Sequence, residues 1–209
     1  MCGITSLADA WLCVEAGADA LGLNFYPGSP RYVSVARARE IASAVPPFVF
    51  LVGVFVDEDP AEVRRVVDET GLHIAQFHGS ESPESLAEYG CPAIKAIRIR
   101  CAEDTRAVER YTAAAFLLDA YRKGVPGGTG ETFEWGLVRS VAREKCIILA
   151  GGLTPANVAD AIRTVRPYAV DVASGIESSP GKKDPDLARR FVESVRQADR
   201  NLSSSTEAF

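Results

Sequence analysis

Residues 146–155 read CIILAGGLTP, and the fold prediction rests on the pattern in this stretch. Four apolar residues follow Cys146, two glycines come next, and Thr154-Pro155 then pairs a capping side chain with a proline suited to the first helical position. The stretch therefore predicts a buried strand over residues 146–152 and a helix that begins at Pro155.

The same alternation of a short apolar run with an amphipathic stretch extends along the whole chain. Apolar runs that are nearly continuous are typical of parallel strands covered by helices. They predict seven strands, at residues 20–25, 48–56, 73–78, 93–99, 114–119, 146–152 and 169–174. An eighth strand would have to lie in residues 1–4, MCGI.

Helix signals occupy the intervals between these runs. Leu7, Trp11 and Val14 share one face of a first predicted helix, and apolar residues at helical spacing predict a second over residues 35–45. Three more dipeptides resemble Thr154-Pro155 and each predict a helix start: Asp59-Pro60, Ser82-Pro83 and Asp184-Pro185.

Eight strand–helix units in 209 residues predict an α/β protein with a single-domain (β/α)8 TIM barrel. A doubly wound open sheet is the competing architecture, because periodicity alone does not show whether a sheet closes. The barrel is preferred since the count reaches eight and no GxGxxG motif follows the first strand. The barrel is placed at residues 1–199, and residues 200–209 are expected to form a disordered tail.

Composition excludes several classes of partner. The net charge is −5, from 23 basic and 28 acidic residues, which argues against nucleic acid binding. No apolar run approaches the ~18 residues that a bilayer span requires, and no secretory signal is recognised. The five cysteines are scattered without a CxxC motif, which favours a reducing cytoplasm over a disulfide framework or a zinc site.

Candidate site residues are read from the strand ends, because a (β/α)8 barrel places its active site at the carboxyl ends of its strands. Residues with polar or small side chains stand at or just after the end of every predicted strand. They are expected to converge on one opening of the barrel, called the mouth below. They are Cys2, Asn24, Asp57, Gln76, His78, Arg98, Asp119, Gly151, Gly152, Ser174 and Gly175.

Two glycine-containing turns predict a phosphorylated substrate. Gly151 and Gly152 lead into a helix N-terminus, while Ser174 and Gly175 stand where a short extra helix would begin. Backbone N–H groups at such turns bind anions, and the last two strands of this fold often hold phosphate. One such turn alone would equally be a tight connection, whereas two on adjacent strands favour a ligand.

Three side chains have both a chemical and a structural interpretation. Asp119 is either a cap or ion-pair partner, or a general acid if desolvation raises its pKa from about 3.9. Cys2 is either a small hydrophobe, or a base if its pKa falls from about 8.5 towards neutral. Arg31, on a proline-flanked loop, is either a surface residue or a ligand for a substrate carboxylate.

Weaker expectations concern the remaining polar residues and one loop. His78 is a candidate for the pocket, with a structural role as the alternative, and Arg98 is a further candidate for substrate contact. Lys182 and Lys183 are expected to be solvated. The glycine-rich residues 121–131 are expected to form a lid that excludes water.

Taken in order, several motifs closely resemble phosphoribosylanthranilate isomerases of tryptophan biosynthesis. The resemblance runs from Cys2 to about residue 195. Its motifs are CGIT at 2–5, EAGADALGLNFYPGSPRYVS at 15–34, VGVFVD at 52–57, QFHG at 76–79, LLDA at 117–120, GGTGETFEW at 127–135, LAGGLTPANV at 149–158 and DVASGIESSPGKKD at 171–184.

This resemblance implies a (β/α)8 barrel that converts N-(5′-phosphoribosyl)anthranilate into 1-(2-carboxyphenylamino)-1-deoxyribulose 5-phosphate, with no metal or organic cofactor. It implies that Cys2 is the general base, Asp119 the general acid and Arg31 the ligand of the anthranilate carboxylate. It assigns the phosphate to Gly151, Gly152, Ser174 and Gly175. The enzyme is expected to be a monomer or a homodimer.

One departure from the family bears on the fold. Only Met1 precedes Cys2, whereas the family carries several residues there. Either the true start lies upstream of Met1, which is the alternative we favour, or the first strand is truncated and leaves the barrel poorly closed beside it, with an unpaired edge.

Two alternatives follow. One is a non-catalytic or impaired phosphosugar-binding barrel, disabled by its clipped first strand. The other is a related phosphosugar isomerase, such as that of histidine biosynthesis, which would have an aspartate in place of Cys2 and two similar halves.

Overall fold

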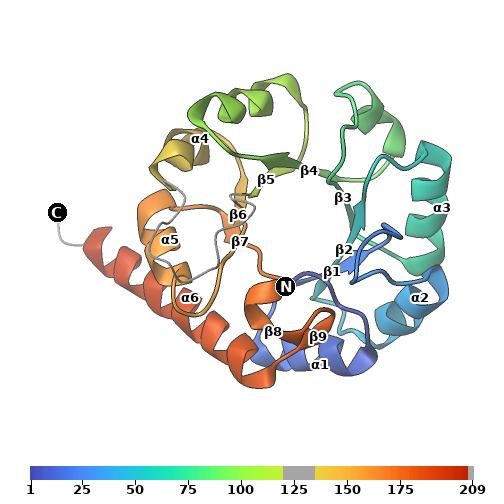
Figure 1. Ribbon diagram of the computed structural model, residues 1–209, viewed down its shortest axis with the longest axis horizontal. Coiled ribbons are helices and arrows are strands. Elements are labelled where there is room, and N and C mark those ends of the chain that lie inside the picture. The colour runs from blue at the N-terminus through green and yellow to red at the C-terminus, as the bar shows by residue number, and fades with distance from the viewer. Residues whose placement is uncertain (120–134, 207–209) are drawn as a thin grey trace.

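A computed structural model describes residues 1–119 and 135–206 and shows a ring of parallel strands surrounded by helices (Figure 1). The seven strands pair in chain order, so that each βα unit adds one strand beside the last. Their bounds are β1 Ala20–Asn24, β2 Phe50–Phe55, β3 Ile74–Phe77, β4 Ala93–Arg98, β5 Ala115–Asp119, β6 Ile147–Ala150 and β7 Ala169–Val170. The predicted (β/α)8 barrel is confirmed, and the open sheet is excluded as an alternative.

Helices cover the outside of this ring (Figure 1). The α-helices are α1 Leu7–Ala16, α2 Val35–Ala44, α3 Pro60–Thr70, α4 Arg139–Glu144, α5 Val158–Val165 and α6 Pro185–Thr206. The 3-10 helices are η1 Ser85–Tyr89, η2 Ala102–Arg110, η3 Trp135–Val138 and η4 Ser174–Ile176. A small antiparallel hairpin, β8 Glu177–Ser179 with β9 Lys182–Lys183, follows η4 and lies beside α1.

The first segment closes the barrel, although it forms only an isolated bridge between Cys2 and Gly22. On one side the Met1 amine donates to the Ala20 carbonyl (2.7 Å) and the Gly22 N–H donates to the Met1 carbonyl (2.9 Å). On the other side the Cys2 N–H donates to the Val172 carbonyl (2.9 Å). The truncated first strand is confirmed. The expected unpaired edge at residues 1–3 is wrong, because these residues bond both neighbours.

Two of the four capping dipeptides start helices where expected. The Asp59 carboxylate accepts from the Ala61 N–H (2.8 Å) at the start of α3, and the Asp184 carboxylate accepts from the Leu187 N–H (2.9 Å) at the start of α6. The helices expected at Pro83 and Pro155 begin later, as η1 at Ser85 and α5 at Val158.

The delay of α5 has a local cause. The Asn157 side chain accepts from the Thr154 N–H (2.8 Å) and donates to the Gly152 carbonyl (3.0 Å). These two bonds hold residues 152–157 as a turn, so the helix starts only after it.

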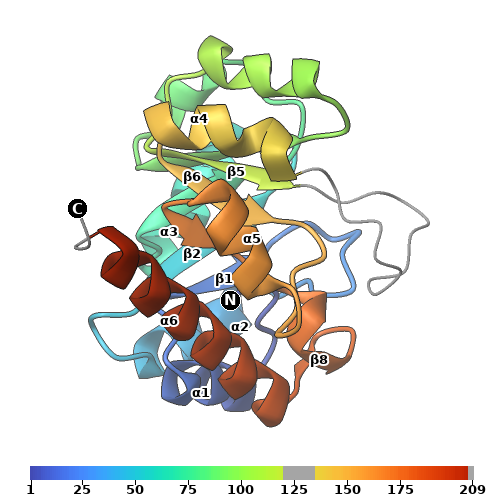
Figure 2. The same ribbon diagram turned by 90° about the vertical axis from the view of Figure 1, so that its left-hand side faces the viewer.

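The last helix, α6, packs against both α1 and α5 and so joins the two ends of the chain on one side of the barrel (Figure 2). It continues to Thr206, beyond residue 199, where the sequence placed the end of the barrel domain. None of the helices in the described ranges is long and apolar enough to cross a membrane.

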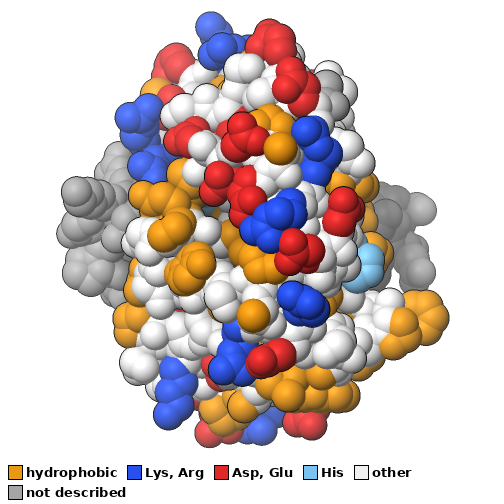
Figure 3. Space-filling model, turned by 90° about the vertical axis from the view of Figure 1, so that its right-hand side faces the viewer, with side chains coloured by type: hydrophobic (Ala, Val, Ile, Leu, Met, Phe, Trp, Pro, Cys, Tyr) orange, Lys and Arg blue, Asp and Glu red, His pale blue; other side chains and the backbone are white. Residues whose placement is uncertain are grey.

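Acidic and basic side chains intermingle on the face covered by α2 and α3 (Figure 3). Arg37 pairs with Glu40 (2.7 Å), and Arg65 pairs with both Glu62 and Glu69 (2.6 Å each). Because these charges neutralise each other locally, this face carries no basic stripe of the kind that a phosphate backbone would require.

Candidate active site

Side chains alternate between the two faces of a strand, and this alternation determines whether a residue at a strand end points into the barrel or away from it. The barrel interior is filled by a buried cluster that includes Val52, Ile94, Ala96, Leu117 and Ala150. Residues two positions further along a strand point to the same side. Asp119, two residues after Leu117, and Arg98, two residues after Ala96, therefore face the inside of the ring at its carboxyl end, as does Gln76 two residues after Ile74.

Asp119 lies at this mouth beside a histidine. Its side chain is 19 % exposed, and its carboxylate is 3.7 Å from His78 Nε2. The other ring nitrogen of His78 is 3.4 Å from Gln76 Nε2. The structure thus brings Gln76, His78 and Asp119 into one row. Arg98, aligned with Asp119 in the β4–β5 register, is exposed. The loop expected as a lid, residues 121–131, falls outside the described residues.

Cys2 lies against β1 with its thiol directed into the barrel. A Cβ atom added at Gly22 would be 2.8 Å from Cys2 Sγ, so the absence of a side chain at Gly22 makes room for the sulfur. Burial and, to a smaller extent, the Asp171 carboxylate raise the pKa of Cys2 to about 12, although the N-terminal amine and Lys183 act in the opposite direction. In the protein without substrate this thiol is therefore neutral, and the decrease towards neutral pKa that the sequence required of a base is not present.

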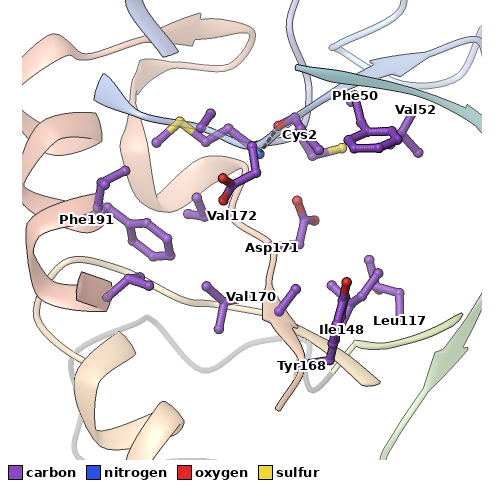
Figure 4. Close-up of a pocket in the computed structure, with 18 of the residues that line it drawn as sticks. Cys2, Phe50, Val52, Leu117, Ile148, Tyr168, Val170, Asp171, Val172 and Phe191 are labelled. Carbon is purple, nitrogen blue, oxygen red and sulfur yellow. Dashed lines mark hydrogen bonds between the residues drawn. The ribbon is translucent and has the colours of Figure 1, made fainter. Parts of the chain in front are cut away.

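A hollow of about 490 Å³ lies below Cys2 (Figure 4). It is lined by interior residues such as Val52 and Leu117, and also by Phe50, Tyr168 and Phe191, which belong to strand starts and to α6. The carboxylate of Asp171, which directly follows β7, points towards the neighbouring first segment (Figure 4). Because its outer lining comes from the amino-terminal side of the strands, we do not assign this hollow to the substrate.

Arg31 forms an ion pair at the edge of the mouth. Its Nε donates to Glu177 Oε1 (2.8 Å) and its Nη2 donates to Oε2 (2.6 Å). The side chain is 22 % exposed, and these bonds raise the pKa of the guanidinium. Nη1 takes no part in this pair. The aliphatic part of the Arg31 side chain passes over Gly3, where an added Cβ would be 2.3 Å from Arg31 Cδ, so Arg31 lies directly over the first segment.

The two glycine turns meet as the sequence predicts. A Cβ added at Gly175 would lie 1.8 Å from the Leu153 carbonyl oxygen, so the turn after β7 is packed tightly on the turn after β6. Gly151 and Gly152 both have positive φ, at 91° and 67°, which other residues rarely adopt. Ser174 and Gly175 open η4, where the first N–H groups have no partner within a helix.

Two buried ion pairs were missed by the sequence analysis. Lys183, expected to be solvated, has a side chain that is 0 % exposed and pairs with Glu177 (2.9 Å). Lys95, 3 % exposed, pairs with Glu81 (2.7 Å) behind the end of β3. Glu81 also accepts from the Gly79 N–H (3.0 Å) and so shapes the turn that follows His78.

Comparisons with known proteins agree on one family. The family model described as N-(5'phosphoribosyl)anthranilate (PRA) isomerase matches residues 1–194. A curated N-(5'-phosphoribosyl)anthranilate isomerase from Cellvibrio japonicus is 52% identical over 206 residues, which cover 98% of this chain and 95% of that protein.

Solved structures lead to the same family. The phosphoribosyl anthranilate isomerase from Thermotoga maritima superposes with a TM-score of 0.87 at 42% identity, over 94% of this chain and 97% of that one. Another isomerase structure, in complex with reduced 1-(o-carboxyphenylamino)-1-deoxyribulose 5-phosphate, gives a TM-score of 0.84 at 40% identity, over 94% and 96% of the two chains.

Proposed function

This chain belongs to the N-(5'-phosphoribosyl)anthranilate isomerase family, and from this premise we propose that Cys2 and Asp119 perform the acid–base steps of its reaction. The enzyme is an isomerase of tryptophan biosynthesis that converts N-(5'-phosphoribosyl)anthranilate into 1-(2-carboxyphenylamino)-1-deoxyribulose 5-phosphate. This is an internal redox rearrangement of an aldose into a ketose, so protons move while no atom is gained or lost.

In the first step Asp119 donates a proton to the ring oxygen of the ribose. The C1′–oxygen bond breaks and the lone pair of the anthranilate nitrogen forms a protonated Schiff base. Asp119 suits this role because it lies at the carboxyl end of β5, half-buried, with His78 3.7 Å away on the neighbouring side of the mouth.

In the second step Cys2 first passes its own thiol proton to solvent and then, as thiolate, removes the proton from C2′. The electrons of that bond neutralise the Schiff base and give an enolamine, which tautomerises to the aminoketose. The observation that carries this assignment is that the first segment, bonded on both sides, directs the Cys2 thiol into the ring, while Asp119 faces the inside of the same ring at the carboxyl end of β5. The two groups therefore approach one sugar from opposite strands of a closed ring.

Substrate contacts are divided among the other strand ends. We assign the phosphate to the packed turns that contain Gly151, Gly152, Ser174 and Gly175, since their N–H groups and helix ends suit an anion. Arg31 is assigned to the anthranilate carboxylate. In the structure its Nε and Nη2 are held by Glu177, which leaves Nη1 as the nitrogen that would meet the substrate.

The remaining candidates lie around the sugar. Gln76 and His78 are assigned to contacts with the ribose hydroxyls from β3, and Arg98 to contact with the substrate from β4.

The alternative of a non-catalytic or impaired barrel has no support from the fold, because the first segment that carries Cys2 is hydrogen-bonded on both sides. We further propose that the enzyme works in the cytoplasm; its five cysteines are all free thiols.

The roles of Cys2 and Asp119 are tested with Cys2→Ala and Asp119→Asn in a fluorescence assay on freshly made phosphoribosylanthranilate. Each variant is expected to lose about 10²–10⁴-fold in kcat, as is typical of acid–base residues, while affinity for the reduced product analogue is retained. Cys101→Ala, at an exposed thiol, is the control and should keep full activity. Near-normal turnover of either purified variant would remove that residue from its role.

A further inference from the structure

The β8–β9 hairpin carries two buried charges that the proposed steps do not use. Glu177 and Lys183 face each other across this hairpin, and their side chains are 4 % and 0 % exposed. Buried charges are costly unless they are paired and hydrogen-bonded, so such a pair requires many partners.

Lys183 uses all three N–H groups of its ammonium. They donate to the Cys2 carbonyl (2.6 Å), the Ala173 carbonyl (3.2 Å) and the Glu177 carboxylate (2.9 Å). Cys2 lies on the first segment of the barrel and Ala173 follows the last strand. The ammonium therefore connects the first segment to the residues that follow β7. It does so next to the hydrogen bond from the Cys2 N–H to the Val172 carbonyl.

Glu177 extends this network to the mouth. Its Oε1 accepts from both Lys183 Nζ and Arg31 Nε, and its Oε2 accepts from Arg31 Nη2. Burial alone would raise the pKa of Glu177, but the hydrogen bonds from Arg31 and Lys183 lower it, so the carboxylate is ionised at neutral pH. One chain of contacts thus runs from the backbone of Cys2 through Lys183 and Glu177 to Arg31.

We propose that Lys183 is a positioning residue for this reaction: it holds the backbone of Cys2 in place, and Glu177 links that position to the guanidinium of Arg31. The inference rests on the proposed role of Cys2 as the base.

The charge of Lys183 also acts on the thiol. The groups that face Cys2 are Asp171 from the end of β7, the N-terminal amine, Lys183 from β9, and Arg31 from the loop after β1. Lys183 lowers the pKa of the thiol against the effect of burial. Its loss is expected to make the thiolate harder to form as well as to release the Cys2 carbonyl.

Lys183→Met tests the inference, and Lys182→Met is its matched control because Lys182 is the exposed neighbour on the same strand. Lys183→Met is expected to lower kcat by about 10–100-fold, the loss typical of a misplaced reacting group. Its Kd for the reduced product analogue should stay within about threefold of wild type, because the phosphate turns and the Arg31–Glu177 pair remain. A purely structural role would weaken binding and turnover together. Lys182→Met should change neither.

A double-mutant cycle separates this inference from the proposed function. If Lys183 acts through Cys2, Lys183→Met adds nothing to the loss already caused by Cys2→Ala. A Lys183→Met enzyme with wild-type kcat, or losses that multiply in the double variant, overturns the inference. Near-normal turnover of Cys2→Ala alone overturns the proposed function instead. If Lys183→Met does not fold, Lys183→Met with Glu177→Gln removes the unpaired carboxylate and must show the same loss of kcat.

Discussion

Gly22→Ala is the substitution that most directly tests how the first segment is placed. Gly22 lies in the middle of β1, opposite Cys2, and its N–H and carbonyl bond Met1 and Gly3. An added Cβ would be 2.8 Å from Cys2 Sγ and 3.0 Å from Cys2 Cα. Carbon atoms normally approach to about 3.5–4.0 Å, so the first segment must move by roughly 0.5–1 Å.

The size of the effect follows from this displacement. Inserting a methyl group into a packed core costs about 1–3 kcal/mol of unfolding free energy. A shift of about 1 Å in a reacting group costs up to about 10²-fold in rate. We therefore expect Gly22→Ala to lose about 1–3 kcal/mol in urea unfolding and about 10–100-fold in kcat in the fluorescence assay.

Gly136→Ala is the control, because an added Cβ there meets nothing within 4 Å and the glycine has no positive φ. It should remain within about 0.5 kcal/mol of wild type in stability and keep full activity. A Gly22→Ala enzyme that loses stability but keeps its kcat would show that the position of Cys2 does not matter for turnover. An unchanged protein by both measures would refute the close contact itself.

Three further predictions follow from the same contacts. Lys95→Met leaves the buried Glu81 carboxylate without its cation and should cost about 3–5 kcal/mol in urea unfolding, whereas the exposed Lys145→Met should cost less than about 0.5 kcal/mol. Gly175→Ala would place a Cβ 1.8 Å from a carbonyl oxygen of the facing turn, so the KM should rise at least about tenfold and competitive inhibition by inorganic phosphate should weaken; unchanged inhibition would place the phosphate elsewhere. Because burial raises the pKa of Cys2 to about 12, wild type should lose stability relative to Cys2→Ala as the pH rises from 9 towards 11, by about 1.4 kcal/mol per pH unit, and parallel pH curves would contradict an enclosed thiol.

The strands were predictable because a buried parallel strand has to be apolar on both faces. Each apolar run became a strand within two residues of its predicted start, from Ala20 in β1 to Ala169 in β7. The predicted end of the last strand, residue 174, was too late. The Asp171 N–H still donates to the Leu149 carbonyl of β6 and the Val172 carbonyl accepts from the first segment, but the chain then turns into η4 at Ser174.

The mouth was predictable for a different reason: the fold itself puts strand ends together. Asp119 and His78 are 41 positions apart yet lie side by side, as two residues at strand ends must. The ion pairs behind them were not predictable. Lys182 and Lys183 are adjacent and identical, and only the register of the hairpin exposes one and buries the other. Glu177 lies 146 positions from Arg31 in the sequence, so the spacing of residues around Arg31 could not predict this ion pair.

The burial of Cys2 also constrains the order of the proposed steps. A thiol whose pKa is raised to about 12, even with the N-terminal amine and Lys183 nearby, is neutral in the free enzyme at neutral pH, so it becomes a base only when a further positive charge lies beside it. Proton donation by Asp119 creates that charge, because ring opening leaves a protonated Schiff base next to C2′. Opposite charges attract far more strongly in a dry enclosure than in water. Ring opening therefore has to precede deprotonation, and an analogue with a neutral nitrogen, such as the reduced product, should leave the reactivity of the thiol at its free-enzyme level.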